Sequence, residues 1–177
     1  KKSDLSDFAQ ASQSAVELVM TNLRRASELV KSFKQVAVDQ SSEQRRLIEL
    51  KPYFEEILTS LRPSTKRFRH VIELDVQDGI HWDSYPGALY QIITNLVLNA
   101  LNHAFAEPDP GVIKIQASAD SDAIWVCVSD NGCGMDAETA NHIFEPFFTT
   151  KRGQGGSGLG LHIVFNLVTS VLGGSIT

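Results

Sequence analysis

Apolar residues near the start of the chain recur at a spacing that predicts a helix packed against other helices. From Val16 to Ala37 they are separated by alternating steps of three and four residues, which is the 3.5-residue period of helical bundles and coiled coils. A single amphipathic helix packed on its own domain usually carries a wider apolar stripe, so the period favours a bundle. Residues 1–40 are therefore predicted to form a bundle helix, and the polar residues 41–45 a linker.

Beyond residue 45, apolar residues alternate with polar ones in some segments and recur at helical spacing in others. Strand-like patterns cover residues 46–50, 70–76, 112–118 and 123–129, and helix-like patterns cover residues 51–61, 86–105 and about 158–172. The segment 130–156 is predicted to be mostly irregular because it is rich in turn-forming residues. Helices combined with a β-hairpin indicate an α/β sandwich with a mixed sheet, in one domain formed by residues 46–177.

Composition places the chain among ordinary globular proteins, with 42% hydrophobic and 21% charged residues. No apolar run approaches membrane-spanning length, and the first residues, KKSDLSDFAQ, lack the apolar segment of a signal peptide. The two cysteines, Cys127 and Cys133, do not have the spacing of metal ligands. Reduced thiols in a cytosolic, cytoplasmic protein are therefore expected.

Charge is distributed unevenly along the chain. Residues 1–69 carry 13 Lys and Arg against 9 Asp and Glu, a net charge of +4, whereas residues 70–177 carry 3 against 12, a net charge of −9. So few basic residues in the larger part argue against nucleic-acid binding. Two of the three, Lys151 and Arg152, stand beside the glycine-rich stretch GQGGSGLGL (153–161), which runs directly into an apolar helical pattern. Backbone N–H groups of such a loop commonly bind phosphate.

Asparagines gather on one face of the helix predicted over residues 86–105. Asn95, Asn99 and Asn102 are four and three residues apart and so share a face, with His103 beside them. Asparagine is a poor helix former, and a merely solvated helix face usually carries Glu and Lys. A polar ligand over this face is therefore predicted.

Four motifs, taken in order, resemble the ATP-binding domain of histidine kinases. The sequences NLVLNALNH (95–103), DNGCGM (130–135), IFEPFFTTK (143–151) and GGSGLGL (155–161) are similar to its asparagine, glycine, phenylalanine and second glycine boxes. The resemblance implies a two-layer Bergerat α/β sandwich whose mixed sheet is covered by helices. It also identifies residues 1–40 as the second helix of a dimerisation hairpin, and GGSIT (173–177) as the start of a segment whose further strands are expected beyond this sequence.

The resemblance implies a role for each motif. Asn99 would give its side-chain oxygen to Mg²⁺, with the triphosphate and waters completing the shell. Asp130 would accept a hydrogen bond from the adenine amino group, and Lys151 would offset phosphate charge. The other residues assigned to ATP are Asn95, Asn102, His103, Gly132, Gly134, Gly156, Gly158, Leu159 and Gly160. The residues assigned to a lid over the nucleotide are Phe147, Phe148, Thr149 and Thr150, of which the two phenylalanines would dock on the helical bundle.

The position four residues before the predicted magnesium ligand separates three possible functions. ATPases of this superfamily typically carry a glutamate there as the general base for water, but this chain has Asn95, which cannot accept a proton in that role. A neutral imidazole is already a nucleophile, so transfer of the γ-phosphoryl group to a histidine in two-component signalling is favoured. An ATP-binding regulatory module without transfer is the alternative, and an ATPase is the third possibility.

The acceptor histidine is expected outside this sequence, so no catalytic residue is assigned within it. The family's acceptor is a histidine followed by an acidic residue on the first helix of the hairpin. The five histidines here are His70, His81, His103, His142 and His162, and none shows that pattern. Apart from His103, ordinary structural roles are expected for them. The expected partners are an acceptor helix of the same or a partner chain, a response regulator, and a second copy in a homodimeric parent protein.

Overall fold

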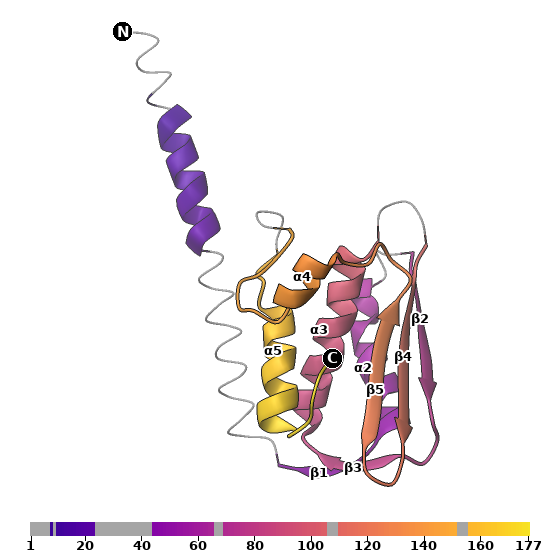
Figure 1. The fold of residues 1–177 in the computed structure, drawn as a ribbon. Coiled ribbons are helices and arrows are strands. Elements are labelled where there is room, and N and C mark those ends of the chain that lie inside the picture. The colour runs from indigo at the N-terminus through magenta and orange to yellow at the C-terminus, as the bar shows by residue number, and fades with distance from the viewer. Residues whose placement is uncertain (1–7, 9, 24–43, 66–68, 106–109, 152–155) are drawn as a thin grey trace. The chain divides into compact units, whose positions relative to one another are not determined.

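The computed structural model describes residues 8, 10–23, 44–65, 69–105, 110–151 and 156–177 (Figure 1). The chain divides into two compact units, residues 1–38 and residues 39–177. In the first unit, residues 10–23 are helical, as the apolar period predicted for this part of the chain. No helix in the described ranges is both long and apolar enough to cross a membrane.

The apolar residues of this first helix are turned to solvent. Val16, Val19 and Leu23, which carry the predicted period, are all exposed. The remaining residues of the period lie outside the described residues; they are Ala26, Val30, Phe33 and Ala37.

The second unit contains all of the strands that the structure describes. Its elements are β1 (Arg46–Glu49), α2 (Leu50–Thr65), β2 (Val71–Val76), β3 (His81–Ser84), α3 (Pro86–His103), β4 (Val112–Ala119), β5 (Ile124–Asp130), α4 (Ala137–His142), α5 (Gly160–Asn166) and the π-helical turn η1 (Leu167–Val171). The predicted strands and helices are confirmed within a few residues at their ends, except that the second helix continues beyond Leu61. Two short elements, β3 and α4, were not predicted, because four and six residues are too few to show a period.

The main sheet is mixed, as predicted. Its strand order is β2-β4-β5, with β2 parallel to β4 and β4 antiparallel to β5, and β1 pairs with β3 in a separate antiparallel ribbon. Helices α2, α3 and α5 lie on one face of this sheet (Figure 1). The arrangement is a mixed α/β fold with two layers.

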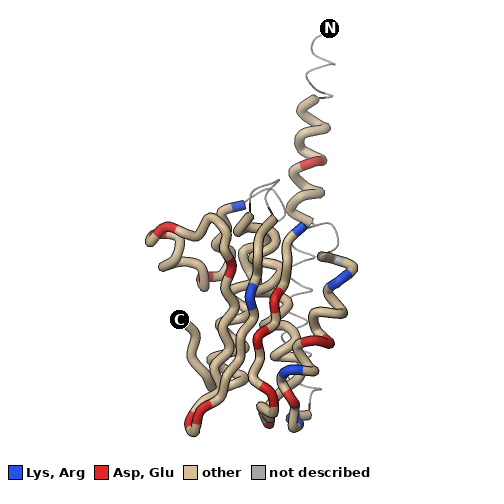
Figure 2. The backbone as a smooth tube through the Cα atoms, turned by 90° about the vertical axis from the view of Figure 1, so that its right-hand side faces the viewer, with Lys and Arg blue, Asp and Glu red and all other residues tan. Residues whose placement is uncertain are grey.

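The core lies between the sheet and these helices. Alternate residues of β4, namely Ile113, Ile115 and Ala117, are buried and face the helices, and the residues between them face solvent. On that outer face Lys114 Nζ lies 3.1 Å from Asp75 Oδ2, where Figure 2 shows basic and acidic segments side by side. This ion pair lies on the face of the sheet opposite to the helices.

Helix α3 carries the asparagines, and its start is fixed by proline. Tyr85 has the extended backbone that a residue before proline favours, Pro86 opens the first turn, and the Tyr53 hydroxyl donates a 2.7 Å hydrogen bond to the Pro86 carbonyl. The apolar face of α3, including Ile93 and Val97 with no exposed surface, packs into the core. The asparagine face is thereby turned away from the core.

Candidate functional site

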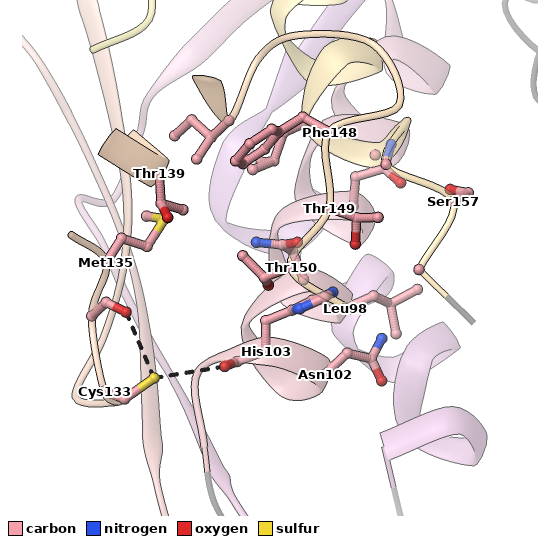
Figure 3. Close-up of a pocket in the computed structure, with 18 of the residues that line it drawn as sticks. Leu98, Asn102, His103, Cys133, Met135, Thr139, Phe148, Thr149, Thr150 and Ser157 are labelled. Carbon is pink, nitrogen blue, oxygen red and sulfur yellow. Dashed lines mark hydrogen bonds between the residues drawn. The ribbon is translucent and has the colours of Figure 1, made fainter. Parts of the chain in front are cut away.

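A cavity of about 440 Å³ lies over the asparagine face of α3. Figure 3 shows Met135 and Thr139 on one side of this space and Leu98 and Ser157 on the other, with Phe148 between the two sides. The walls therefore come from α3, the turn after β5, α4, and the loop that leads into α5. The full set of lining residues is Asn95, Leu98, Asn99, Asn102, His103, Cys133, Gly134, Met135, Asp136, Thr139, Ile143, Phe148, Thr149, Thr150, Gly156, Ser157, Gly158, Gly160 and Leu161.

The asparagine face is the polar wall of the cavity. Asn95, Asn99, Asn102 and His103 all line it, so the structure brings these predicted residues together. The side-chain nitrogen of Asn95 is buried and has no hydrogen-bond partner among the described residues. A buried donor without a partner costs about 1–3 kcal/mol, and Gln91 Oε1 and Thr94 Oγ1 on the same helix are also buried without a partner among the described residues.

His103 has a lowered pKa and lies near Lys151 at the C-terminal end of α3. Burial, and in second place the positive charge of Lys151, lower the pKa of His103 below its usual value. The Lys151 ammonium donates a hydrogen bond to the backbone carbonyl of Asn102, close to the C-terminus of α3, where a positive charge is favoured. Lys151 thus lies beside the cavity, although it is not among the lining residues.

The turn after β5 approaches α3 closely. The N–H of Cys133 donates to the Ala104 carbonyl at 2.8 Å, and a Cβ at Gly132 would lie 2.3 Å from that same oxygen. Asp130 Oδ1 accepts a 3.0 Å hydrogen bond from the Gly132 N–H, which fixes the turn, and Gly134 has a φ of 69°. Gly134 lines the cavity, whereas Asp130 and Gly132 stand at the end of β5, outside its wall.

Helix α4 supplies a wall that the sequence pattern did not reveal. Met135, Asp136, Thr139 and Ile143 line the cavity. Asp136 Oδ1 accepts a 2.6 Å hydrogen bond from the Thr139 N–H, so it is the N-cap of α4, and this bond lowers the pKa of its carboxyl group. The aspartate three residues before a threonine was the available signal for this short helix.

The two predicted lid phenylalanines point in different directions. Phe148 lines the cavity with Thr149 and Thr150, and its ring centroid lies 5.8 Å from that of His142. The side chain of Phe147 is 52% exposed. The two side chains point in different directions because Phe147 has a φ of 68°. The sequence pattern does not reveal this backbone conformation.

The glycine-rich segment forms the wall next to α5. Gly156, Gly158 and Gly160 line the cavity together with Ser157 and Leu161, and Leu159 is buried behind them. Residues 152–155, which include Arg152 and the first glycines of the predicted lid, lie outside the described residues.

Comparisons with known proteins identify the family of the C-terminal half of the chain. Residues 85–177 match the family described as "Histidine kinase-, DNA gyrase B-, and HSP90-like ATPase". The chain is 33% identical over 146 residues to the "Putative sensor protein" of Shewanella frigidimarina, covering 82% of this chain and 22% of that protein. It is 41% identical over 83 residues to the sensor histidine kinase ZraS of Escherichia coli K12, covering 47% and 17%. The chain thus spans about a fifth of the length of these relatives.

Solved structures show the same likeness. The catalytic domain of the histidine kinase ThkA has a TM-score of 0.62 at 26% identity, covering 71% of this chain and 80% of that one. The histidine kinase AdeS of Acinetobacter baumannii has a TM-score of 0.61 at 21% identity, covering 85% and 70%; at that identity the likeness concerns the fold.

Proposed function

The chain belongs to the histidine kinase-, DNA gyrase B- and HSP90-like ATPase family and contains a sensor histidine kinase catalytic domain, and we propose that its cavity binds Mg²⁺-ATP and donates the γ-phosphoryl group to a histidine outside this sequence. The observation that carries the proposal is the asparagine wall, in which Asn95, Asn99 and Asn102 line one cavity opposite the glycine-rich segment. Amide groups of this wall can bond to the nucleotide and to its metal ion.

The residues present fit a magnesium ion held mainly by its nucleotide. Magnesium is usually bound by one or two protein oxygens, with substrate phosphates and waters in the other positions. Asn99 lines the cavity and offers one amide oxygen of this kind. The ion would supply positive charge that neutralises the triphosphate.

The charged and glycine-lined walls would hold the phosphates. Lys151 brings a positive charge beside Asn102, and His103, which also lines the cavity, offers a ring nitrogen. Backbone N–H groups of Gly156, Gly158, Leu159 and Gly160 would donate to phosphate oxygens, and the lack of a Cβ at the three glycines favours close approach. The hydroxyls of Thr149 and Thr150 stand on the adjoining wall.

The apolar part of the cavity lining would hold adenine. Leu98, Met135, Ile143 and Phe148 give the lining an apolar surface for a flat base. Asp130 would accept a hydrogen bond from the adenine amino group with the carboxylate oxygen that does not bind the Gly132 N–H. Guanine presents a carbonyl at that point, and two acceptors facing each other are unfavourable.

Transfer to histidine is favoured over hydrolysis by the chemistry of Asn95. An amide cannot remove a proton from water, whereas an imidazole nucleophile needs little activation. We infer that the acceptor lies on a helix of the same or a partner chain, that the parent protein is a homodimer, and that a response regulator receives the phosphoryl group in the cytoplasm. The exposed apolar residues of helix 10–23, such as Val16 and Val19, support a role in a dimerisation hairpin.

Following the γ-phosphate tests the function. ATP labelled at this position, with Mg²⁺, would be given to the chain alone and together with the segment that precedes it in its parent protein. Acid-labile, base-stable label on the added segment is expected, with loss of label in Asn99→Ala. Asn141→Ala is the matched control, because Asn141 is an exposed asparagine on α4 outside the cavity wall.

Each other result would change the assignment. Free phosphate released by the chain alone would identify an ATPase and contradict the role given to Asn95. Nucleotide that binds but is never transferred would instead support the regulatory module.

A further inference from the structure

A strained turn lies between α4 and the cavity. The N–H of Phe148 donates to the Glu145 carbonyl at 3.4 Å, Pro146 occupies the second position, and Phe147 has a φ of 68° in the third. This is the pattern of a type II turn, which favours glycine in the third position. A bulky residue in this conformation costs about 1–3 kcal/mol and persists only where its surroundings hold it.

Helix α5 holds the residue that precedes this turn. His162 Nδ1 lies 2.9 Å from the Phe144 carbonyl oxygen, and because a carbonyl only accepts, Nδ1 carries the hydrogen. In a neutral ring Nε2 is then the acceptor, and the Asn166 side-chain amide lies 3.1 Å from it. Asn166 is one helical turn further along α5, so it fixes both the orientation and the tautomer of His162.

The turn itself is held by the segment that leads into α5. The N–H of Phe147 donates to the Gly158 carbonyl at 2.8 Å. Gly158 itself has a φ of 69°, and a Cβ there would lie 2.5 Å from the Phe147 carbonyl carbon. The rings of Phe144 and Phe165 add an aromatic contact, with centroids 5.6 Å apart. The turn is therefore fixed to the same helix whose first residue lines the cavity.

We propose that His162, oriented by Asn166, is a positioning residue for the nucleotide site. Its hydrogen bond to Phe144 fixes the chain just before the strained turn and acts together with the bond from the Phe147 N–H to Gly158, so that Phe148 forms part of the cavity wall while Phe147 stays outside. Without this bond the turn relaxes towards a negative φ at Phe147, and Phe148 moves out of the wall. The proposal rests on the proposed function only for the statement that the ligand is a nucleotide.

The test separates the hydrogen bond from the bulk of the side chain. His162→Leu removes both ring nitrogens, whereas His162→Asn keeps an N–H donor at the same number of bonds from the backbone as Nδ1. Asn166→Leu removes the support of the ring, and Ser170→Ala, an exposed residue of η1, is the control. Two quantities would be measured: hydrogen exchange of the peptide covering residues 143–151 in the free chain, and the Kd of Mg²⁺-ATP by calorimetry.

In His162→Leu we expect exchange of this peptide to be about tenfold faster and the Kd to rise about three- to tenfold, the size of one lost hydrogen bond. Asn166→Leu should shift both quantities in the same direction by less, and His162→Asn should restore both to within about twofold of the unaltered chain. Unchanged exchange in His162→Leu would overturn the proposal, and so would a failure of His162→Asn to restore it, since packing alone would then explain the effect. If the unaltered chain binds no nucleotide, the proposed function fails, and the exchange rates still decide the role of His162.

Discussion

Gly132 packs so closely on Ala104 that a Cβ at position 132 would lie 2.3 Å from the Ala104 carbonyl oxygen. The same carbonyl accepts the Cys133 N–H, so the turn after β5 is bonded to the last residues of the asparagine helix. This contact sets the distance between two walls of the cavity. Its glycine is required by close approach rather than by a positive φ.

We therefore expect Gly132→Ala to cost more than Gly134→Ala. The first variant places a methyl group against backbone atoms that cannot move aside, and overpacking of this kind costs about 1–3 kcal/mol. At Gly134 nothing lies within 4 Å of the point that a Cβ would occupy, so only the positive φ opposes alanine, at about 1 kcal/mol. Urea unfolding and the Kd of Mg²⁺-ATP would rank the two, and a larger effect at Gly134 would contradict this account.

We predict that the chain hydrolyses ATP poorly because Asn95 cannot act as a general base, and this explanation can be tested by placing a base at position 95. Asn95→Glu places a carboxylate four residues before Asn99, and we expect it to release free phosphate from ATP faster than the unaltered chain does. Asn95→Gln is the matched control, because it has the same length and shape without the basic oxygen. Phosphate release would be measured at saturating ATP, so that weaker binding does not mask the result. Equal rates in the two variants would show that a base at this position is not what hydrolysis lacks.

The long, periodic elements were predictable from the sequence because a single face of each is buried. In α3, Pro86 marks the start, and Ile93 and Val97 define the core face, which leaves Asn95 and Asn99 on the opposite side. Strand β4 alternates in the same way, with Ile113, Ile115 and Ala117 buried. For these elements the local pattern and the tertiary burial agree, which is why the asparagine wall could be placed from the sequence.

The parts that could not be predicted depend on contacts between segments distant in sequence. Met135 and Thr139 reach the cavity because a helix of six residues follows a capping aspartate, and six residues show no period. The opposite orientations of Phe147 and Phe148 follow from one positive φ, held by Gly158. Leu159 is assigned to the ligand from its motif through its backbone N–H, and burial of its side chain leaves that assignment a prediction.

The lowered pKa of His103 predicts a loss of folding stability in weak acid. The unfolded chain has the ordinary pKa near 6.5, and the folded chain a lower one, so the folded state binds the proton less well. Above pH 6.5 His103 is unprotonated in both states and does not lower the free energy of unfolding. As the pH falls from 6.5 towards the pKa of the folded state, the unfolded state takes up the proton more readily, so the free energy of unfolding decreases. Asp136 also has a lowered pKa, but its ordinary value is 3.8, so its loss occurs in stronger acid.

Urea unfolding at pH 7.5 and pH 5.5 would check this prediction. The unaltered chain should lose stability between the two, and His103→Asn should lose less, since asparagine does not titrate. Bound Mg²⁺-ATP should reduce the loss, because phosphate next to His103 favours its charged form. An identical pH dependence in His103→Asn would show that other groups are responsible.

The exposed side chain of Phe147 can be separated from its strained backbone. Phe147→Gly removes the strain of a positive φ from the folded state, about 1–2 kcal/mol. It also raises the conformational entropy of the unfolded chain, which destabilises the folded state by about 0.5–1 kcal/mol. Because the side chain is 52% exposed, little burial is lost, and the free energy of unfolding should change by no more than about 1 kcal/mol. The Kd of Mg²⁺-ATP should stay within about twofold, since Phe147 is outside the cavity wall.

Phosphoryl transfer, in contrast, should fall about tenfold in Phe147→Gly, because an aromatic ring that docks on the acceptor helices contributes apolar burial of about 1.5 kcal/mol or more. Phe147→Leu keeps most of the apolar surface and is expected to retain most of the transfer. Labelled ATP with the preceding segment as acceptor gives the measurement. Transfer by Phe147→Gly at the rate of the unaltered chain would mean that Phe147 does not contact the acceptor, and the positive φ would then serve only to direct Phe148 into the cavity.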